Sequence, residues 1–284
     1  MQINDSFRIC ETAWCPGCGD VQILEALKNA LEILKKRPHE VLIAAGIGQA
    51  AKTPQYINTN GFCGLHGRAL PPAAAAKIAN KNLTVIISTG DGDSYGEGGN
   101  HFIHNIRRNV DITHFVHNNQ IYGLTKGQAS PTTDVGHTTA IQPNGTINNP
   151  MNPLLLAIAL GAGFVARAFS GENEHLTTIM VEAIKYKGYA LVDILQPCIS
   201  FNKVNTFQWY SKRVYKLDSS YNYADKPAAM AKAMEWGDRI PLGILYKENK
   251  NTYHDKIDFL KDGLPLVDKV TDKNMVGTFM EEFV

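Results

Sequence analysis

Two short polar motifs in this sequence have residue types that suit a site for a metal ion and a diphosphate. Gly90-Asp91-Gly92 follows one apolar segment, and Asn118-Asn119 follows the next. Carboxylate and amide oxygens are hard ligands that suit Mg²⁺, which also keeps phosphate oxygens among its ligands. The glycines let the backbone approach a phosphate, and a helix after Asp93 would direct its N-terminal N–H groups at the same anion. Gly-Asp-Gly alone is more typical of a capped strand-to-helix turn, so the Asn pair makes the prediction specific.

The cysteines form a second set of candidate ligands. Cys15 and Cys18 are separated by Pro-Gly, so both thiolates can reach one metal centre. Cys198 follows a later apolar segment and could join them. Such a set suits a [4Fe-4S] cluster, which normally uses four Cys thiolates, or zinc, which also takes four ligands. A thioredoxin-like redox pair would need a different βαβ context from this one.

Apolar segments that alternate with helical patterns must position these residues. Five runs rich in β-branched residues are typical of buried strands, and apolar residues spaced by threes and fours between them are typical of helices. The alternation predicts an α/β fold in which a doubly wound parallel sheet is covered by helices on both faces. Asp20 is expected to cap the first helix. The expected strands are 41–45, 83–89, 112–117, 164–169 and 190–195, and the expected helices are 21–34, 71–80, 98–108 and 172–187.

The candidate residues come directly after four of these strands. The turn Gly46-Ile47-Gly48 follows the first strand, and Asp91 and Asn119 follow the second and third. Cys198 follows the last strand. Ligands of parallel sheets bind beyond the carboxyl ends of the strands, and crossovers of one hand place those ends at one edge. The sequence therefore predicts one composite site.

Two segments depart from the α/β pattern. Residues 130–153 are rich in Thr, Pro, Asn and Gly, and their length indicates a functional or partner-facing loop. After Lys212 the alternation stops, apart from an expected helix at Ala228–Trp236. We therefore divide the chain into a ligand-binding domain, residues 1–212, and a C-terminal arm, residues 213–284, that packs on a partner subunit.

The composition excludes several classes of protein. The 28 basic and 27 acidic residues give a net charge of +1, without the basic surface of a general nucleic-acid-binding protein. No segment has the roughly 20 apolar residues that cross a bilayer, and residues 1–8 lack an apolar signal core. Five cysteines, an odd number, argue against a secreted disulfide framework. These features predict a cytoplasmic protein.

Taken together, the motifs resemble the β subunit of 2-oxoacid:ferredoxin oxidoreductases, and the run from Gly90 to Asn119 resembles the thiamine-diphosphate signature. The resemblance covers most of residues 10–205, in the family's order. The Tyr122–Thr132 run is more similar to the branch that acts on 2-oxoglutarate and related 2-oxoacids than to the pyruvate branch. The matching segments are Trp14–Gly19, His66–Leu70, Gly90–Asp93, Arg107–Asn109, Tyr122–Gln128, Ser130–Thr132 and Gln196–Cys198.

The resemblance implies a role for each candidate residue. Asp91 and Asn119 would bind Mg²⁺ by their side chains, and Ile121 would bind it by its carbonyl. His66 and Ile47 would be the catalytic positions, beside the cofactor. The remaining cofactor-binding positions would be Gly46, Gly48, Gly67, Arg68, Gly90, Gly92, Asp93, Gly123, Leu124 and Thr125.

The resemblance also implies a [4Fe-4S] cluster on Cys15, Cys18 and Cys198, with one departure. The family's further cysteine belongs directly after Gly46-Ile47-Gly48, where this chain has Gln49. An amide is a neutral, hard ligand that binds cluster iron poorly. The fourth iron then carries another ligand, or the cluster is absent or labile, or one of two remaining cysteines completes it: Cys63 or Cys10.

The activity that the resemblance implies is CoA-dependent oxidative decarboxylation of a 2-oxoacid, with 2-oxoglutarate favoured and electrons passed to ferredoxin. Thiamine enzymes usually need a Glu on the aminopyrimidine ring, and Glu97 lies instead at the diphosphate end. The Glu is therefore expected from an α subunit, which makes this chain half of an active site. Two alternatives remain: a subunit of a non-redox thiamine-diphosphate 2-oxoacid decarboxylase, and a nucleotide- or metal-binding α/β module with a Cys-X-X-Cys zinc site.

Overall fold

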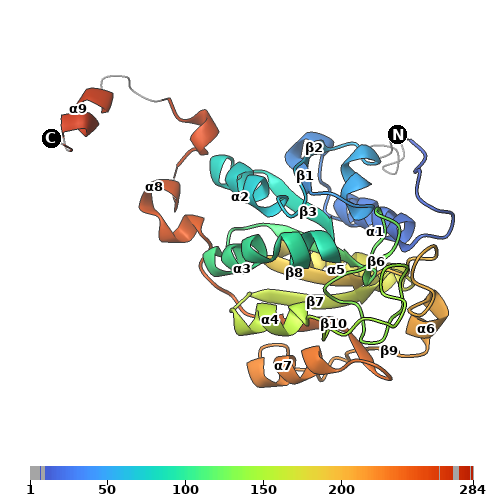
Figure 1. Ribbon diagram of the computed structural model, residues 1–284. Helices are drawn as coiled ribbons and strands as arrows, with labels where there is room; N and C mark the ends of the chain where they lie inside the picture. The colour runs from blue at the N-terminus through green and yellow to red at the C-terminus, as the bar shows by residue number, and fades with distance from the viewer. Residues whose placement is uncertain (1–6, 8–9, 262, 271–274, 282, 284) are drawn as a thin grey trace.

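The computed structural model describes the whole chain except residues 1–6, 8–9, 262, 271–274, 282 and 284. Its centre is an eight-stranded sheet with the order β2-β1-β3-β4-β8-β7-β10-β9 (Figure 1). The expectation for residues 1–8 lies largely outside the described residues. The strands of the sheet are β1 (Val41–Ala45), β2 (Asn60–Cys63), β3 (Thr84–Gly90), β4 (Thr113–Asn118), β7 (Phe164–Phe169), β8 (Ala190–Leu195), β9 (Val214–Lys216) and β10 (Ile240–Lys247).

Helices cover both faces of the sheet. Successive residues of each strand point to opposite faces, so each strand contributes side chains to two cores. In β3, Ile86 packs into a core with α1 (Gly19–Ile33) and α5 (Asn173–Lys185). Its neighbours Val85 and Ile87 pack into a second core on the other face. The helices of that second core are α2 (Leu70–Ala79), α3 (Gly99–Arg108), α4 (Pro153–Ala159) and α7 (Lys226–Met234). The predicted doubly wound α/β fold is therefore confirmed.

The expected site edge also forms. Strands β1, β3, β4 and β8 are neighbours in the sheet and all run parallel. Gly90 pairs with His117, so the segments that follow β3 and β4 leave the sheet side by side. Asn118 pairs with Leu195, which brings the segment after β8 to the same edge. Because the strands pair in parallel without a register shift, the candidate residues that follow them lie together at one edge of the sheet.

The chain beyond Lys212 differs from the expectation. Strand β10 pairs antiparallel with β7, and β9 pairs parallel with β10, so this part of the chain completes the sheet. The prediction that the α/β pattern stops at Lys212 was wrong for these two strands. Pro241 and Gly243 interrupt the apolar run of β10, which hid it from the sequence pattern. The contact of the arm with a partner subunit stays a prediction.

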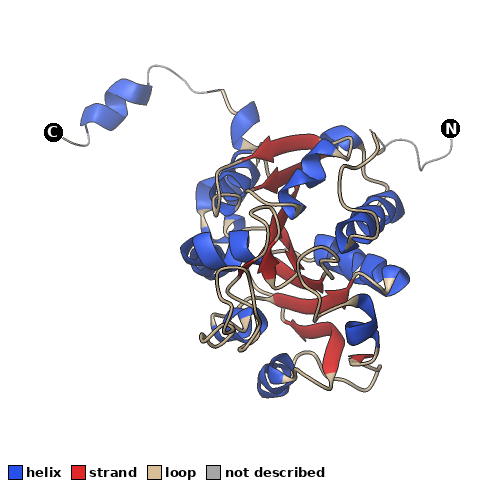
Figure 2. Cartoon of the chain, turned by 45° about the vertical axis from the view of Figure 1, so that its right-hand side comes forward, coloured by secondary structure: helices blue, strands red, loops and turns tan. Residues whose placement is uncertain are grey.

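Shorter elements complete the structure. Figures 1 and 2 show α9 lying away from the sheet, and none of its described residues is buried. Among the described residues, no helix is long and apolar enough to span a membrane. The elements not yet given are β5 (Ile121–Tyr122), β6 (Gln128–Ala129), α6 (Phe207–Ser211), α8 (Asp258–Lys261), α9 (Met275–Glu281), the 3₁₀ turns Pro38–Glu40, Ala50–Gln55, His254–Lys256 and Leu266–Asp268, and the π-helical turn Gly92–Glu97.

Asp20 does not cap the first helix as expected. The helix begins at Gly19, and Cys18 occupies the N-cap position without a capping side chain. The Asp20 side chain is buried, and its Oδ1 lies 2.7 Å from Nδ1 of His117 on β4. A buried carboxylate requires a partner, and the imidazole supplies it from the sheet. The pair fixes the start of α1 against β4.

Truncation tests whether β9 and β10 belong to the folded core. A chain that ends at Lys212 leaves β7 an unpaired edge and uncovers its apolar residues, so we expect it to aggregate or to show no cooperative thermal transition. A chain that ends at Asp268 retains all the strands that the structure describes. We expect its Tm by circular dichroism to stay within a few degrees of the full chain. A cooperative transition in the shorter chain would refute this role for the two strands.

Candidate active site

Asp91 lies at the end of β3 and is almost completely buried, with a relative exposure of 1 %. Its Oδ2 accepts hydrogen bonds from Ser130 Oγ at 2.5 Å and Thr132 Oγ1 at 2.6 Å. Burial raises the pKa of Asp91 to about 6, although the two hydroxyls favour its charged form. Both hydroxyls come from the loop predicted to be functional or partner-facing. Neither hydroxyl was among the predicted site residues, although Ser130-Pro131-Thr132 carried part of the resemblance.

The turn after β4 holds the second predicted metal-binding side chain. Asn119 Oδ1 accepts a hydrogen bond from the backbone N–H of Ile121 at 3.0 Å. Between these two residues Gln120 has φ 58°, a left-handed conformation that is uncommon for a residue with a side chain. The Gln120 side chain is fixed by donation to the Thr132 carbonyl and by acceptance from Tyr210 Oη, at 2.8 and 3.0 Å. The surrounding hydrogen bonds thus hold a strained turn in place.

The donor set of this edge fits Mg²⁺. Asp91 offers a carboxylate, Asn119 an amide oxygen and Ile121 a carbonyl, and all three are hard oxygen ligands from neighbouring strand ends. Among the described residues, no group of three or more His, Cys, Asp and Glu side chains could hold a metal ion. A site with one carboxylate relies on amide, carbonyl and phosphate oxygens, which is the usual way proteins bind Mg²⁺ with a diphosphate.

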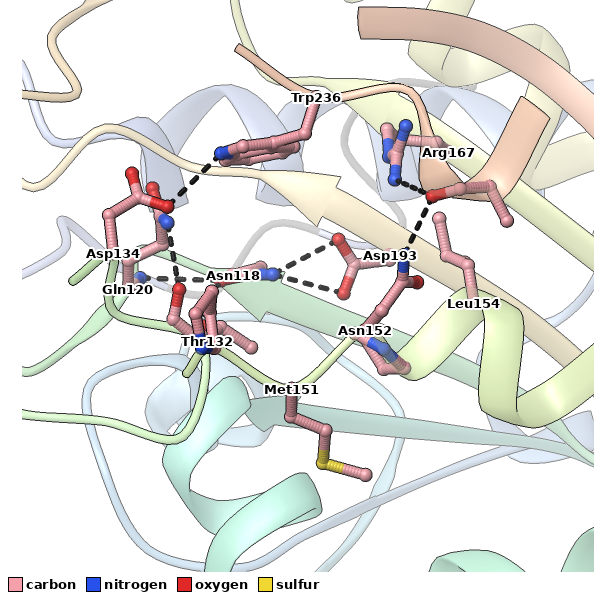
Figure 3. A pocket seen from close by; sticks show the side chains of 13 residues that line it. Asn118, Gln120, Thr132, Asp134, Met151, Asn152, Leu154, Arg167, Asp193 and Trp236 are labelled. Carbon is pink, nitrogen blue, oxygen red and sulfur yellow. Dashed lines mark hydrogen bonds between the residues drawn. The ribbon is translucent and has the colours of Figure 1, made fainter. Parts of the chain in front are cut away.

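A buried polar network continues from Thr132, which donates to Asp91, into the sheet; Figure 3 shows its members Thr132, Asn118 and Asp193. Thr132 Oγ1 donates to Asn118 Oδ1 at 2.9 Å, and Asn118 Nδ2 donates to both carboxylate oxygens of Asp193 on β8. Tyr95 Oη donates to the same carboxylate at 2.8 Å. Burial raises the pKa of Asp193, because nearby hydrogen bonds and charges offset only part of the lost hydration. Thr132, Asn118 and Asp193 line one side of a cavity of about 160 Å³. No motif in the sequence indicated this cavity.

Asp93 joins two turns of the site edge. Its Oδ1 accepts hydrogen bonds from the backbone N–H groups of Gly67 and Ile47, at 2.7 and 3.2 Å, and lies 2.7 Å from His66 Nδ1. Burial raises the pKa of Asp93. Its Oδ2 is buried and lacks a hydrogen-bond partner among the described residues. A Cβ on Gly46 would lie 2.1 Å from that oxygen, so only glycine fits there.

The segment after Asp91 forms a π-helical turn before α3, and such wide turns are frequent at functional sites. Tyr122 covers it closely: a Cβ on Gly92 would lie 2.2 Å from its ring, and a Cβ on Gly96 would lie 2.6 Å from its Oη. Tyr122 Oη donates to the Glu97 carboxylate at 3.1 Å. Because Gly92 and Gly96 lack a Cβ, the Tyr122 ring can pack directly on the backbone of this turn.

The other predicted cofactor-binding residues lie around the same edge. Gly48 has φ 137°, a conformation that favours glycine. Ile47 and Leu124 are exposed, at 39 % and 43 %. Arg68 is exposed as well, and Thr125 Oγ1 donates to the Gln128 side chain. Gly90 ends β3 and Gly123 follows β5.

Three of the five cysteines lie around one pocket. Cys15, Cys18 and Cys198 line it together with Gln49. Cys18 is the most buried of the three, and burial raises the pKa of its thiol. Cys63 does not line this pocket and is exposed at the end of β2. The structure thus brings together the three predicted cysteines but not the suggested fourth one.

Comparisons with known proteins agree with this geometry. Residues 39–194 match the family model described as thiamine pyrophosphate enzyme, C-terminal TPP binding domain. Residues 198–262 match the family model for the C-terminal part of the pyruvate ferredoxin oxidoreductase beta subunit. The chain is 46 % identical to a 2-oxoacid:ferredoxin oxidoreductase subunit beta of Saccharolobus solfataricus, over 86 % of this chain and 85 % of that protein. This chain belongs to the family of 2-oxoacid:ferredoxin oxidoreductase beta subunits.

Two further relatives lie within this family. The 2-oxoglutarate oxidoreductase subunit KorB of Mycobacterium tuberculosis is 45 % identical, over 68 % of this chain and 52 % of that protein. A solved 2-oxoglutarate:ferredoxin oxidoreductase from Magnetococcus marinus, with 2-oxoglutarate, coenzyme A and succinyl-CoA bound, matches with a TM-score of 0.91 at 34 % identity. That match covers 98 % of this chain and 96 % of the other. The predicted family, its enzyme class and its thiamine-diphosphate-binding domain are confirmed, and a beta subunit implies an alpha partner.

Replacing Asp91 by Asn should stabilise the metal-free beta subunit. The raised pKa means that the folded chain binds a proton more tightly than the unfolded chain, so Asp91 costs stability as pH rises from about 4 to above 6. We expect the variant to gain up to about 3 kcal/mol at pH 7, and the gain to shrink as pH falls toward 4. Urea unfolding across this pH range, without divalent ions, measures it. A variant less stable than wild type at pH 7 would contradict the assignment.

Gly46→Ala should displace the Asp93 carboxylate, because its new methyl group would overlap Oδ2. We expect thiamine diphosphate affinity to fall at least tenfold by calorimetry on the assembled enzyme, since both turns held by Asp93 must shift. Gly99→Ala is the matched control, because nothing lies within 4 Å of its added Cβ. Equal affinities in the two variants would show that Asp93 does not organise the site.

Proposed function

We propose that this beta subunit is the thiamine-diphosphate-binding half of a CoA-dependent 2-oxoacid:ferredoxin oxidoreductase that prefers 2-oxoglutarate. The observation that carries the proposal is the juxtaposition of Asp91 and Asn119 at neighbouring strand ends. The relatives named for 2-oxoglutarate, and the solved neighbour with 2-oxoglutarate bound, support the choice of substrate. When bound, thiamine diphosphate supplies the carbon nucleophile and the electron sink.

The chain's own residues would hold the diphosphate end of the cofactor. Asp91, Asn119 and the Ile121 carbonyl would bind Mg²⁺, which neutralises the diphosphate charge. The backbone of Gly92 and of residues 123–125 would lie against the phosphates. Because Tyr122 covers Gly92 and Gly96, the ring must remain beside the diphosphate or move when it enters. His66, held by Asp93, would present its ring toward the reacting end.

The site is proposed to be completed by the alpha subunit. Glu97 is engaged by Tyr122 Oη, and its Oε2 lies 3.6 Å from His66 Nε2, which leaves it on the diphosphate side. The Glu that assists the aminopyrimidine would therefore come from the partner chain. The exposed side chains of Ile47 and Leu124 at this edge suit coverage by that partner, which would also exclude water from the reaction.

Electrons would leave through an iron–sulfur cluster held by Cys15, Cys18 and Cys198, and ferredoxin would accept them. The three thiols surround one pocket at the edge where Asn119 also lies. A second candidate function, a non-redox 2-oxoacid decarboxylase subunit, is favoured by a single observation: Gln49 lines this pocket where the family has a further cysteine. Iron content and visible absorbance distinguish the two.

Co-expression with the alpha subunit tests the proposed function. We expect CoA-dependent viologen reduction with a panel of 2-oxoacids, with 2-oxoglutarate giving the highest kcat/KM, and no turnover by this chain alone. Asp91→Ala should abolish Mg²⁺-dependent thiamine diphosphate binding in calorimetry, because it removes the carboxylate ligand. Asp238→Ala, at a fully exposed carboxylate, should leave binding unchanged. Full turnover by the isolated chain would disprove the half-site, and CoA-independent release of aldehyde would favour the decarboxylase.

A further inference from the structure

The cysteine pocket of this chain offers three thiols and one amide to a cluster, and this difference from the family has a specific consequence. Cys15, Cys18 and Cys198 line the pocket with Gln49. Each cysteine of a [4Fe-4S] cluster binds a different iron, so its ligands need not converge on one point as those of a single ion do. The three thiols therefore fit three corners of a cluster. The inference rests on the proposed iron–sulfur function and concerns the fourth corner.

Gln49 is held in place at this pocket. The indole N–H of Trp14 donates to the Gln49 carbonyl oxygen at 3.0 Å, and Trp14 immediately precedes Cys15. On its other side, the Gln49 side chain lies near Gly123, where an added Cβ would be 3.9 Å from Gln49 Cγ. The residue therefore stands between the cysteine segment and the turn after β5. Its side chain is a neutral amide, which is a poor ligand for iron in a sulfide cluster.

Two other oxygen-bearing side chains of the pocket, those of Asp20 and Ser200, lie beside its thiols. Gln196 Oε1 lacks a hydrogen-bond partner among the described residues, but it is a neutral amide oxygen like that of Gln49. Asp20 Oδ1 lies 2.7 Å from His117 Nδ1, and its Oδ2 lies 3.5 Å from Cys18 Sγ. Ser200 Oγ donates to Cys15 Sγ at 3.2 Å. The Asp20 carboxylate and the Ser200 hydroxyl therefore both contact cysteine sulfur atoms. The Ser200 hydroxyl, and the Gln196 amide whose Nε2 donates to Cys18 Sγ at 3.4 Å, suit hydrogen bonding to cysteine sulfur, which tunes a cluster without binding its iron.

The remaining cysteines lie elsewhere. Cys63 ends the exposed edge strand β2, where it pairs with Ala45 four residues before Gln49. Cys10 is exposed, and its thiol donates to the Gln55 carbonyl at 3.7 Å. Neither residue lines the cysteine pocket. Among the described residues, the pocket therefore contains three thiols and not four.

We propose that this beta subunit binds a [4Fe-4S] cluster whose fourth iron has no protein thiolate and is lost on mild oxidation. The step is balanced: [4Fe-4S]²⁺ releases one Fe²⁺ and one electron and becomes [3Fe-4S]⁺, and ferricyanide accepts the electron. An iron held only by sulfides and an exchangeable ligand leaves more easily than one anchored by cysteine. Loss of one thiolate also removes one negative charge around the cluster, which makes it easier to reduce.

Gln49→Cys tests the proposal in the assembled, anaerobically purified enzyme. Wild type should hold about four irons per chain and release about one on ferricyanide treatment, with the near-isotropic EPR signal of an oxidised [3Fe-4S] cluster. Gln49→Cys should keep its iron, remain EPR-silent after the same treatment, and show a lower reduction potential. Gln49→Ala is the matched control and should behave as wild type, because the amide is not a ligand.

Other outcomes would overturn the proposal. A wild-type enzyme that retains all its iron, or a Cys63→Ser variant that loses it, would identify a fourth protein ligand. If the Gln49→Ala variant lost iron under conditions where wild type keeps it, the Gln49 amide would be the fourth protein ligand. If the enzyme contained no iron but still bound thiamine diphosphate, the cluster proposal would be refuted and the proposed binding of thiamine diphosphate would stand. Failure of the proposed function gives a different result. The iron would then behave as described, but the preparation would not reduce the dye with any 2-oxoacid.

Discussion

The buried carboxylate of Asp91 is the group on which the site depends. Burial disfavours its charge, and two loop hydroxyls, from Ser130 and Thr132, return only part of the lost hydration. The long loop is consequently tied to the end of β3, and the backbone N–H of Met151 anchors it further on Pro131. A carboxylate kept in this state is prepared for a cation, because a metal ion would replace the missing charge compensation. The proposed Mg²⁺ site would thus gain affinity for the metal at the cost of stability of the metal-free chain.

Behind this edge, two buried imidazoles, those of His114 and His117, link the strands to neighbouring segments. Burial lowers the pKa of His114 to about 3, so the ring is neutral and bonds Thr89, Ser94 and Tyr189. Its contact with Ser94 fixes the π-helical turn against β4. His117 joins Asp20, which stands two residues after Cys18, while His117 itself stands two residues before Asn119. The proposed cluster segment and the proposed magnesium turn are therefore parts of one rigid unit.

The sequence predicted the central sheet well because its parallel strands are continuous apolar runs; β1, β7 and β8 match the expected bounds. It also predicted which strand ends meet, since that follows from topology. It could not predict β10, whose Pro and Gly break the pattern and whose pairing is decided by the uncovered edge of β7. Asp193 was likewise hidden inside an apolar strand, because its partners Asn118 and Tyr95 are distant in sequence. The Asp20 cap failed for the same reason: a tertiary partner outweighed the local preference.

The late position of β10 in the chain has a consequence for biosynthesis. Strand β7 ends at Phe169, but its antiparallel neighbour is not complete until Lys247. During translation the nascent chain therefore carries an open sheet edge, flanked by apolar residues, while some 80 further residues are made at roughly 5–20 residues per second. Such edges recruit other strands. The cofactor-binding strands can pair early, yet the protein stays vulnerable to aggregation, or dependent on chaperones, until nearly seven-eighths of it has been synthesised.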